Sequence, residues 1–301
     1  MTVQYITVTK TDQGQRLDNF LIRELKGVPK SRIYKIVRSG EVRVNSGRVK
    51  ASFRLCENDK IRIPPIRTAT RAPVIKAGEL GRSLKQRIVF EDTDLIALDK
   101  PAGLAVHGGS GVDAGVVEIL RASMDHPRLE LVHRLDRGTS GILLIAKSRP
   151  ALVQAQKHFR HREVQKIYNL LVHGRWPVKK RVIQDRLLRY TTPWGERRVK
   201  VDDNGMQART DFQILETSSQ VTLLQARIHT GRTHQIRVHA ATQGHPVVGD
   251  EKYKSSEGPY LSDVRLCLHA RKLVIPHLGQ PLKLEVPVPE EFSSVWGQLN
   301  S

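Results

Sequence analysis

The sequence predicts an α+β protein in which a small α+β domain precedes a large domain built on a mixed, mostly antiparallel sheet with flanking helices. Candidate strands outnumber candidate helices, and short turns join many successive strands, which favours antiparallel pairing over a doubly wound parallel sheet. Residues 14–65 carry helix and strand signals of their own, whereas residues 66–86 are rich in Arg, Ala, Thr, Pro and Gly without a sustained period. We therefore expect a small domain at 14–65, a linker at 66–86 and a large domain at 87–301.

The net charge of the chain indicates the class of partner that it binds. The 301 residues include 50 Lys and Arg against 30 Asp and Glu, a formal net charge of +20 that is spread along the chain. Such an excess predicts a nucleic acid partner ahead of an anionic membrane surface. No stretch approaches the roughly 18 apolar residues of a membrane span, and the first residues lack the basic start and apolar core of a signal peptide. The two cysteines, Cys56 and Cys267, form no zinc or disulfide pattern. We expect a soluble, cytoplasmic protein.

Residues 14–65 hold 13 Lys and Arg and 5 Asp and Glu, so 13 − 5 gives +8. Apolar residues at helical spacing predict one helix that begins at Arg16 and a second that follows Pro29 and is closed by Gly40. Period-two alternation then predicts short strands. These are a hairpin made of 41–45, a turn at 45–47 and a return at 48–50, and a further strand at 59–63.

The cations of this segment form a candidate face for binding nucleic acid, made of Arg16, Lys30, Arg32, Lys35, Arg38 and Arg43. A single surface Lys or Arg is more often simply solvated, but together they add salt-dependent affinity for phosphates. The segment resembles the ribosomal-protein-S-four-type RNA-binding domain through Arg16-Leu17-Asp18, Ser31-Arg32 and residues 40–45. That resemblance implies binding to structured RNA and no chemistry of its own.

In the large domain, apolar runs predict strands and helices around three polar motifs. The expected strands are 88–92, 95–101, 142–147, 167–173 and 221–228, and the expected helices are 116–124 and 151–162.

The first motif, His133-Arg134-Leu135-Asp136-Arg137-Gly138-Thr139-Ser140-Gly141, forms a turn that runs into the apolar strand. It places one carboxylate, Asp136, between two arginines. Nearby cations stabilise an ionised carboxylate, so Asp136 suits a nucleophile or a base better than a general acid. The alternative is an Asp that caps the turn or pairs with Arg134.

The second motif places Tyr168 in an apolar strand, where a tyrosine is usually part of the core. The third, residues 231–239, joins a glycine turn to a basic helix or strand and is followed by 244–250. His229, His234 and His239 recur every five residues, which puts helical side chains about 140° apart. They therefore do not share one helical face, and we expect no metal site. These histidines are expected to hydrogen-bond loops or contact RNA.

Taken together, these motifs resemble those of the RluA-type pseudouridine synthases. The matching segments are His133-Arg134-Leu135-Asp136, Thr139-Ser140-Gly141, Lys166-Ile167-Tyr168, residues 234–239, residues 100–104 and Val106-His107. Residues 16–21, 25–31, 63–65 and 105–111 further resemble a bacterial subgroup that modifies large-subunit ribosomal RNA. The resemblance implies the pseudouridine synthase fold and isomerisation of uridine without a cofactor or metal.

Roles for individual residues follow from the same resemblance. Asp136 would be the essential carboxylate, with attack on the sugar, attack on the base and abstraction of a sugar proton all open. Arg237 would pair with Asp136, and Tyr168 would stack on the target base and help remove the C5 proton. Substrate contacts would come from Arg134, which fills the space left by the flipped base, and from Leu104 and Ile236 as apolar walls.

The implied partner is large-subunit ribosomal RNA, modified at several uridines near the peptidyl-transferase centre. We expect a monomer with no obligate protein partner and no membrane association. Two other classes stay open from the residues alone. One is a binding protein whose catalytic fold is only a scaffold, and the other is a metal-dependent nuclease or hydrolase that uses the histidines.

Overall fold

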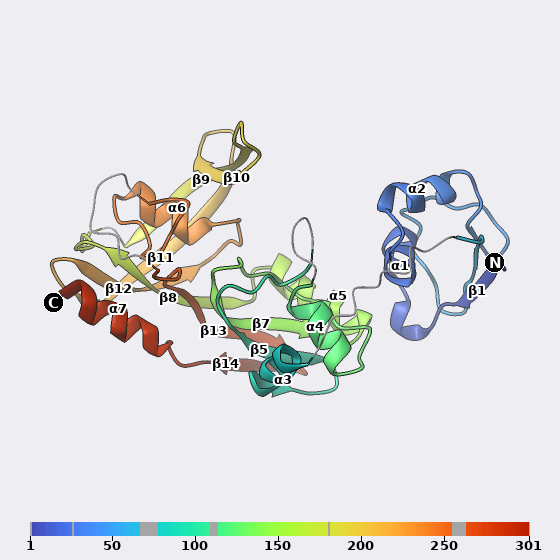
Figure 1. Cartoon of the computed structure of the whole chain (residues 1–301), viewed down its shortest axis with the longest axis horizontal. Helices are drawn as coiled ribbons and strands as arrows, with labels where there is room; N and C mark the ends of the chain where they lie inside the picture. Colours follow the sequence, from blue (N-terminus) through green and yellow to red (C-terminus); the bar gives the residue numbers. More distant parts are fainter. Residues whose placement is uncertain are drawn as a thin grey trace.

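The computed structural model describes residues 2–25, 27–66, 78–108, 114–179, 181–254 and 263–300. It has a small N-terminal domain beside a larger domain built on one long, curved sheet (Figure 1). The predicted α+β class, with a mixed, mostly antiparallel sheet and flanking helices, is confirmed. Among the described residues, no helix has the length and apolar character needed to cross a membrane.

The small domain packs two helices on a three-stranded antiparallel sheet of order β1-β3-β2. Its elements are β1 (Gln4–Thr7), the 3-10 helix η1 (Lys10–Asp12), α1 (Leu17–Glu24), α2 (Lys30–Arg38), β2 (Arg43–Val44) and β3 (Lys60–Ile63). The helices bury Phe20 and Leu21 of α1 against Ile33 and Ile36 of α2, as their helical spacing predicts. The sheet also takes in β1, which lies before the predicted start of the domain at residue 14, because β1 pairs along β3.

The predicted hairpin between 41–45 and 48–50 is wrong. Strand β2 pairs with β3 instead, and the return segment contributes only an isolated bridge between Val44 and Gly47. Asn45 explains the difference, because its side-chain amide donates to Asp59 Oδ1 at 2.7 Å and its Oδ1 accepts from Lys60 N at 2.8 Å. These bonds hold the turn against β3. Strand β2 therefore pairs with β3, and the return segment does not form a strand beside β2.

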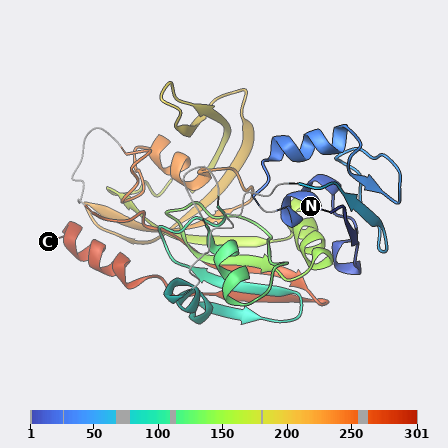
Figure 2. The same ribbon diagram turned by 45° about the vertical axis from the view of Figure 1, so that its right-hand side comes forward.

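The structure differs from the predicted linker at 66–86 in the second half of that segment. Residues 67–77 lie outside the described residues, but α3 (Glu79–Gln86) is a helix. Leu84 is fully buried in the core of the large domain, and a single apolar anchor of this kind leaves little periodic signal in a polar stretch. Where the two domains meet, η1 contacts α5 (Arg149–Arg160), and Figure 2 shows this helix beside the small domain. Arg128 donates a hydrogen bond to Thr11 Oγ1.

The described residues of the large domain form one sheet of eleven strands and four helices in addition to α3. Its strands are β4 (Ile88–Glu91), β5 (Leu95–Lys100), β6 (Glu130–Leu131), β7 (Ser140–Ala146), β8 (Gln165–His173), β9 (Val182–Thr191), β10 (Arg197–Val201), β11 (Met206–Thr217), β12 (Val221–Ile228), β13 (Leu268–His277) and β14 (Gln280–Glu285). Its helices after α3 are α4 (Val116–Ser123), α5 (Arg149–Arg160), α6 (Gln235–Thr242) and α7 (Glu290–Asn300).

The main path of the sheet runs β10-β9-β11-β12-β8-β13-β7-β5-β4, with β14 beside β13 and β6 beside β7. Among the described residues, every strand pair of this sheet is antiparallel except β13 with β7. At that parallel contact Gly141 has φ +104°, and a Cβ there would lie 2.3 Å from the carbonyl oxygen of Ala270. Only glycine allows the two strands to approach so closely.

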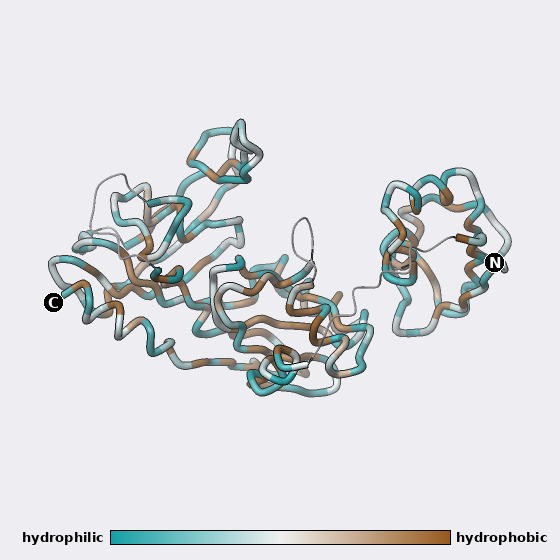
Figure 3. The backbone as a smooth tube through the Cα atoms, in the orientation of Figure 1, coloured by the Kyte–Doolittle hydropathy of each residue, from teal (hydrophilic) through white to brown (hydrophobic). Residues whose placement is uncertain are grey.

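Both faces of the central sheet are covered, so β7 is buried along its whole length and apolar from Gly141 onward. Leu143 and Ile145 point into a core shared with α3, α4 and α6, whereas Ile142 and Leu144 point into a second core under α5. Figure 3 shows hydrophobic residues along these central strands. Helix α7 packs on the α5 side of the sheet, where Phe292 meets Leu171 of β8. The side that carries α6 is the one on which the candidate site lies.

Candidate active site

The loop between β6 and β7 carries Asp136 and is anchored on both sides of it. Leu135 is buried in the main core, and the amide of Thr139 donates to the carbonyl of Asp136 at 3.1 Å. Upstream, His133 stacks on Phe159, and its Nε2 accepts a hydrogen bond from Leu144 N at 3.0 Å. Burial lowers the pKa of His133 to about 3, with the charge of Lys166 acting in the same direction. The ring is therefore neutral and can accept that bond.

The Asp136 carboxylate is partly open to solvent, with a side-chain exposure of 27%. Its Oδ2 lies 3.6 Å from Arg237 Nη1 and 3.9 Å from His234 Nε2. Both distances are longer than a hydrogen bond, so the carboxylate faces positive charge while its lone pairs stay available to a substrate. The sequence-adjacent Arg134 and Arg137 are not its ion-pair partners among the described residues, so the expected stabilisation by these two flanking charges is corrected to stabilisation by Arg237.

Arg237 is held by a partner that sequence reasoning missed. Its Nε and Nη2 donate to Oδ2 and Oδ1 of Asp250, each at 2.7 Å, and the Asp250 side chain is fully buried. Burial alone would lower the pKa of Arg237, but the hydrogen-bonded carboxylate of Asp250 raises it. A bidentate pair also sets the orientation of the guanidinium, so one remaining N–H group is directed at Asp136.

His234 connects a second missed residue, Tyr253, to the site. It takes the left-handed conformation, with φ 54°, just before α6. Its Nδ1 lies 2.6 Å from the Tyr253 hydroxyl, which accepts a hydrogen bond from Val199 N at 3.0 Å. Burial raises the pKa of Tyr253 to about 12, so the hydroxyl keeps its proton and can donate it to Nδ1. The neutral imidazole then carries its own proton on Nε2, which faces Asp136.

Lys100 stabilises the loop that carries Asp136 and the loop that follows β5. Its ammonium is completely buried and donates to the carbonyls of Pro101 and Leu104, each at 2.8 Å, and of Arg137 at 3.2 Å. Burial lowers the pKa of Lys100 to about 8, against the opposing influence of Asp136. Gly103 and Arg137 lock the same two loops together through a pair of hydrogen bonds. Lys100, the last residue of β5, therefore helps to position Arg137, the residue that follows Asp136.

Tyr168 lies on β8 with its ring in the main core and is 9% exposed. Burial raises the pKa of its hydroxyl, and the negative charge of Asp136 acts in the same direction. Ile236 belongs to the same buried cluster, and Leu104 packs against it. The structure thus gathers Asp136, Tyr168 and Arg237 in one region, with the predicted apolar residues behind them.

A cleft of about 1,110 Å³ opens over Asp136. Arg134 lines it, as does the β9–β10 hairpin that projects from the sheet in Figure 1. Basic side chains dominate its walls, namely Arg134, Arg137, Arg189, Arg197, Arg198, Arg237, Lys252 and Arg265, against the acids Asp136 and Glu251. Trp194 at the end of the hairpin is 81% exposed. The cleft suits a polyanion that presents one group to the carboxylate.

The three histidines spaced by five have separate partners. His229 binds Asp211, His234 binds Tyr253, and His239 binds Thr210. Within the described ranges, no group of three His, Cys, Asp or Glu residues is placed to hold a metal ion.

The predicted RNA-binding cations of the small domain fall into two groups. Lys30, Arg32, Lys35 and Arg38 lie exposed on α2, and none has an ion-pair partner within the described part of the chain. Arg16 and Arg43 are different. Arg16 is bound to the buried Asp18 at 2.6 Å, and Arg43 donates to the carbonyls of Gly40 and Ser46.

Comparisons with known proteins cover both domains. A model of the RNA pseudouridylate synthase family matches residues 94–242, and an S4 domain model matches residues 15–61. Ribosomal large subunit pseudouridine synthase C of Yersinia pestis is 46% identical, over 96% of this chain and 93% of the relative. The protein of the same name from Escherichia coli K12 is 43% identical, over 96% and 94%. Among solved structures, human RNA pseudouridylate synthase domain containing 4 aligns with a TM-score of 0.63 and 27% identity, over 75% of this chain and 97% of that one.

Proposed function

The chain belongs to the RNA pseudouridylate synthase family, and on this premise we propose that it isomerises specific uridines of large-subunit ribosomal RNA to pseudouridine through Asp136. Membership of the family makes the chain an RNA pseudouridine synthase, as the sequence motifs predict. The ribosomal substrate is supported by the names of the relatives, which match nearly the full length of the chain.

One observation carries the proposal. Asp136 stands in a basic cleft, 3.6 Å from an arginine whose other donors are held by the buried Asp250. This arrangement keeps a carboxylate oriented without engaging its oxygens in a tight hydrogen bond. Such a group can attack or deprotonate a nucleotide that enters the cleft.

The reaction needs no external electrons or groups. The bond between N1 and C1′ of the uridine breaks, the uracil turns, and C5 joins C1′, after which the proton on C5 is lost and N1 gains one. Asp136 would act in the first step by attack on the sugar, by attack on the base or by removal of a sugar proton. Tyr168 would stack on the base and help remove the C5 proton. Because burial raises the pKa of its hydroxyl and keeps it protonated, the hydroxyl would have to pass its own proton to water as it accepts the one from C5.

RNA binding would use two basic surfaces. The exposed cations of α2 would bind phosphates of structured RNA, and the cleft would hold the target nucleotide after it leaves its stack. Arg134 would fill the vacated space in the RNA, and Leu104 and Ile236 would contact the uracil. We further propose several target uridines near the peptidyl-transferase centre.

We also propose that the protein acts as a cytoplasmic monomer, with a small domain that begins at β1 and a large domain that begins at α3 rather than at the predicted residues 14 and 87. Light scattering after size-exclusion chromatography, with and without RNA, tests the oligomeric state. Limited proteolysis followed by mass spectrometry tests the boundary, and cleavage confined to the region between residues 67 and 77 would support it.

The first test measures tritium release from large-subunit ribosomal RNA that carries [5-³H]uridine and lacks pseudouridine. We expect release by the wild type without added metal, and a loss of at least about a thousandfold in Asp136→Asn, because the essential carboxylate is gone. Asp203→Asn, at an exposed turn, is the matched control and should retain activity.

Three outcomes would contradict the proposal. Tight binding without release would indicate a binding protein, and strand cleavage that stops in a chelator would indicate a nuclease. Undiminished release by Asp136→Asn would remove that residue from the chemistry. Release from transfer RNA instead of ribosomal RNA would change the substrate but not the reaction.

A further inference from the structure

A second hollow lies on the opposite face of the sheet from Asp136. Along β11, Thr210 points to the α6 side, where Gln235 and His239 bind its hydroxyl at 3.0 and 2.9 Å. Because alternate side chains of a strand point to opposite faces, Arg209 and Asp211 point away from α6. Helix α6 carries Arg237, so the face that bears Arg209 is turned away from the catalytic carboxylate.

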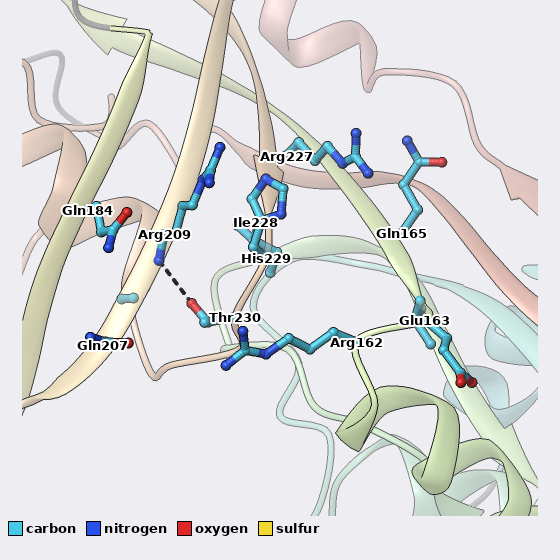
Figure 4. Close-up of a pocket in the computed structure, with 12 residues that line it drawn as sticks. Arg162, Glu163, Gln165, Gln184, Gln207, Arg209, Arg227, Ile228, His229 and Thr230 are labelled. Atoms are coloured by element: carbon cyan, nitrogen blue, oxygen red, sulfur yellow. Dashed lines mark hydrogen bonds between the residues drawn. The ribbon is translucent and has the colours of Figure 1, made fainter.

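We name this hollow the back-face pocket, and its volume is about 350 Å³. Three arginines and three glutamines line it, namely Arg162, Arg209, Arg227, Gln165, Gln184 and Gln207. They come from the turn after α5 and from β8, β9, β11 and β12, and Figure 4 shows Arg162 and Arg209 on opposite sides of the opening. The volume is within the range of ligand pockets, roughly 300–1,000 Å³.

The pocket has an excess of positive charge. Asp211 is occupied by Arg209 at 3.0 Å and by His229 at 2.7 Å. Glu163 is paired with His158 and His161 and points away from the opening in Figure 4. Two cations, Arg162 and Arg227, then have no ion pair or side-chain hydrogen bond to any described residue.

The positive charge of the pocket also affects the pKa of a neighbouring lysine. The pKa of Lys166, next to the pocket, is lowered by burial and also by the positive charge of Arg162. The side-chain amides of the three glutamines add donors that carry no charge. Guanidinium groups and amides together form the donor set that binds a phosphate group with several hydrogen bonds.

We propose that the back-face pocket, with the unpaired cations Arg162 and Arg227 in its walls, binds a backbone phosphate of the substrate RNA at a segment remote from the target uridine. The proposal rests on the proposed function, since a long RNA supplies a phosphate at every nucleotide and is large enough to reach both faces of the sheet. The net charge of +20 draws such a polyanion to the whole molecule, and the pocket adds a defined contact for it.

The test compares Arg162→Gln/Arg227→Gln with the matched control Arg82→Gln/Lys85→Gln, which removes the same charge from exposed positions on α3. Binding of large-subunit ribosomal RNA is measured from 50 to 300 mM salt. Loss of one phosphate contact should reduce the slope of log K against log salt by about 1. The affinity should fall roughly tenfold, as expected for one charge-assisted hydrogen bond. The control should keep the wild-type slope.

A second variant guards against a folding defect. Gln184→Glu places a carboxylate in the pocket at an exposed position, and it should also weaken RNA binding, whereas Gln86→Glu on α3 should not. The melting temperature of each variant reports its fold.

A slope equal to that of the control overturns the proposal. So does saturable binding of inorganic phosphate by the wild type, measured by calorimetry, when the RNA slope is unchanged, since the pocket would then serve a free anion. Tritium release by the wild type is measured on the same RNA. An arginine-dependent slope without any release would leave the pocket standing and reject the proposed function instead.

Discussion

The small domain and the catalytic cleft are both strongly basic, but they hold their cations in different ways. On α2 the four cations are exposed and have no carboxylate partners among the described residues. In the cleft, Arg237 is 8% exposed and is clamped by a fully buried carboxylate. Exposed cations give affinity that depends on salt and little on position, whereas a buried, bidentate cation gives position at the cost of desolvation. The first arrangement suits capture of RNA and the second suits chemistry.

The largest effect is expected from a substitution that breaks the buried ion pair between Arg237 and Asp250. Asp250→Asn leaves Arg237 without its charged partner, and removal of one member of a buried pair costs about 3–5 kcal/mol. We expect a comparable fall in the free energy of unfolding, measured in urea. We also expect slower single-turnover tritium release, because the freed guanidinium can close on Asp136.

The control for this prediction is Asp202→Asn, which removes an acid from an ion pair with Lys200, whose side chain is 52% exposed. Surface pairs contribute little to stability, so the urea midpoint of this variant should stay near the wild-type value. If the two variants are equally stable, burial of the Asp250 pair does not distinguish the two regions.

The next effect is on the pH dependence of the free energy of unfolding. His133 has a pKa of about 3 in the folded protein, against an ordinary value of 6.5, so between these values the unfolded chain binds more protons than the folded one. Stability is therefore lost as the pH falls from 6.5 toward 3. In His133→Gln this part of the acid sensitivity should be absent, since glutamine does not titrate.

Urea unfolding of both proteins at several pH values between 3.5 and 7 measures the difference. His161→Gln, at an exposed position at the end of α5, is the control and should follow the wild type. Parallel curves for wild type and His133→Gln would show that the ring does not support the Asp136 loop through its neutral form.

The smallest effect concerns the exposed cations. Lys35→Gln/Arg38→Gln should lower the slope of log K against log salt by up to about 2, if each cation contacts one phosphate. The fold should be unaffected, because neither side chain has a partner among the described residues. Binding of ribosomal RNA at several salt concentrations measures it, and Lys85→Gln with Arg82→Gln serves again as the charge-matched control. An unchanged slope would mean that α2 is a solvated surface.

Much of the local structure could be predicted because it depends on near neighbours. Helical spacing located α1 and α2, and the apolar run after Gly141 located β7. Where prediction failed, distant contacts decided the outcome. The 41–50 hairpin is replaced by a pairing of β2 with β3 because Asn45 binds residues 59 and 60, and helix α3 is kept in place by one leucine in a distant core.

For the site, the sequence by itself determined the family, the carboxylate Asp136 and the basic character of both domains, because motif identity and charge are properties of residue order and composition. The family resemblance implies that Arg237 pairs with Asp136, but the tertiary structure alone shows how the arginine is held there. Arg237 reaches Asp136 from α6 across 101 residues, and its orientation comes from Asp250, a buried acid 13 residues further on. The back-face pocket likewise joins Arg162, in the turn after α5, to Gln184 of β9 and Arg227 of β12, which lie 22 and 65 residues further along the chain. Side-chain partners of this kind follow from the packing of strands and helices, and no local pattern encodes them.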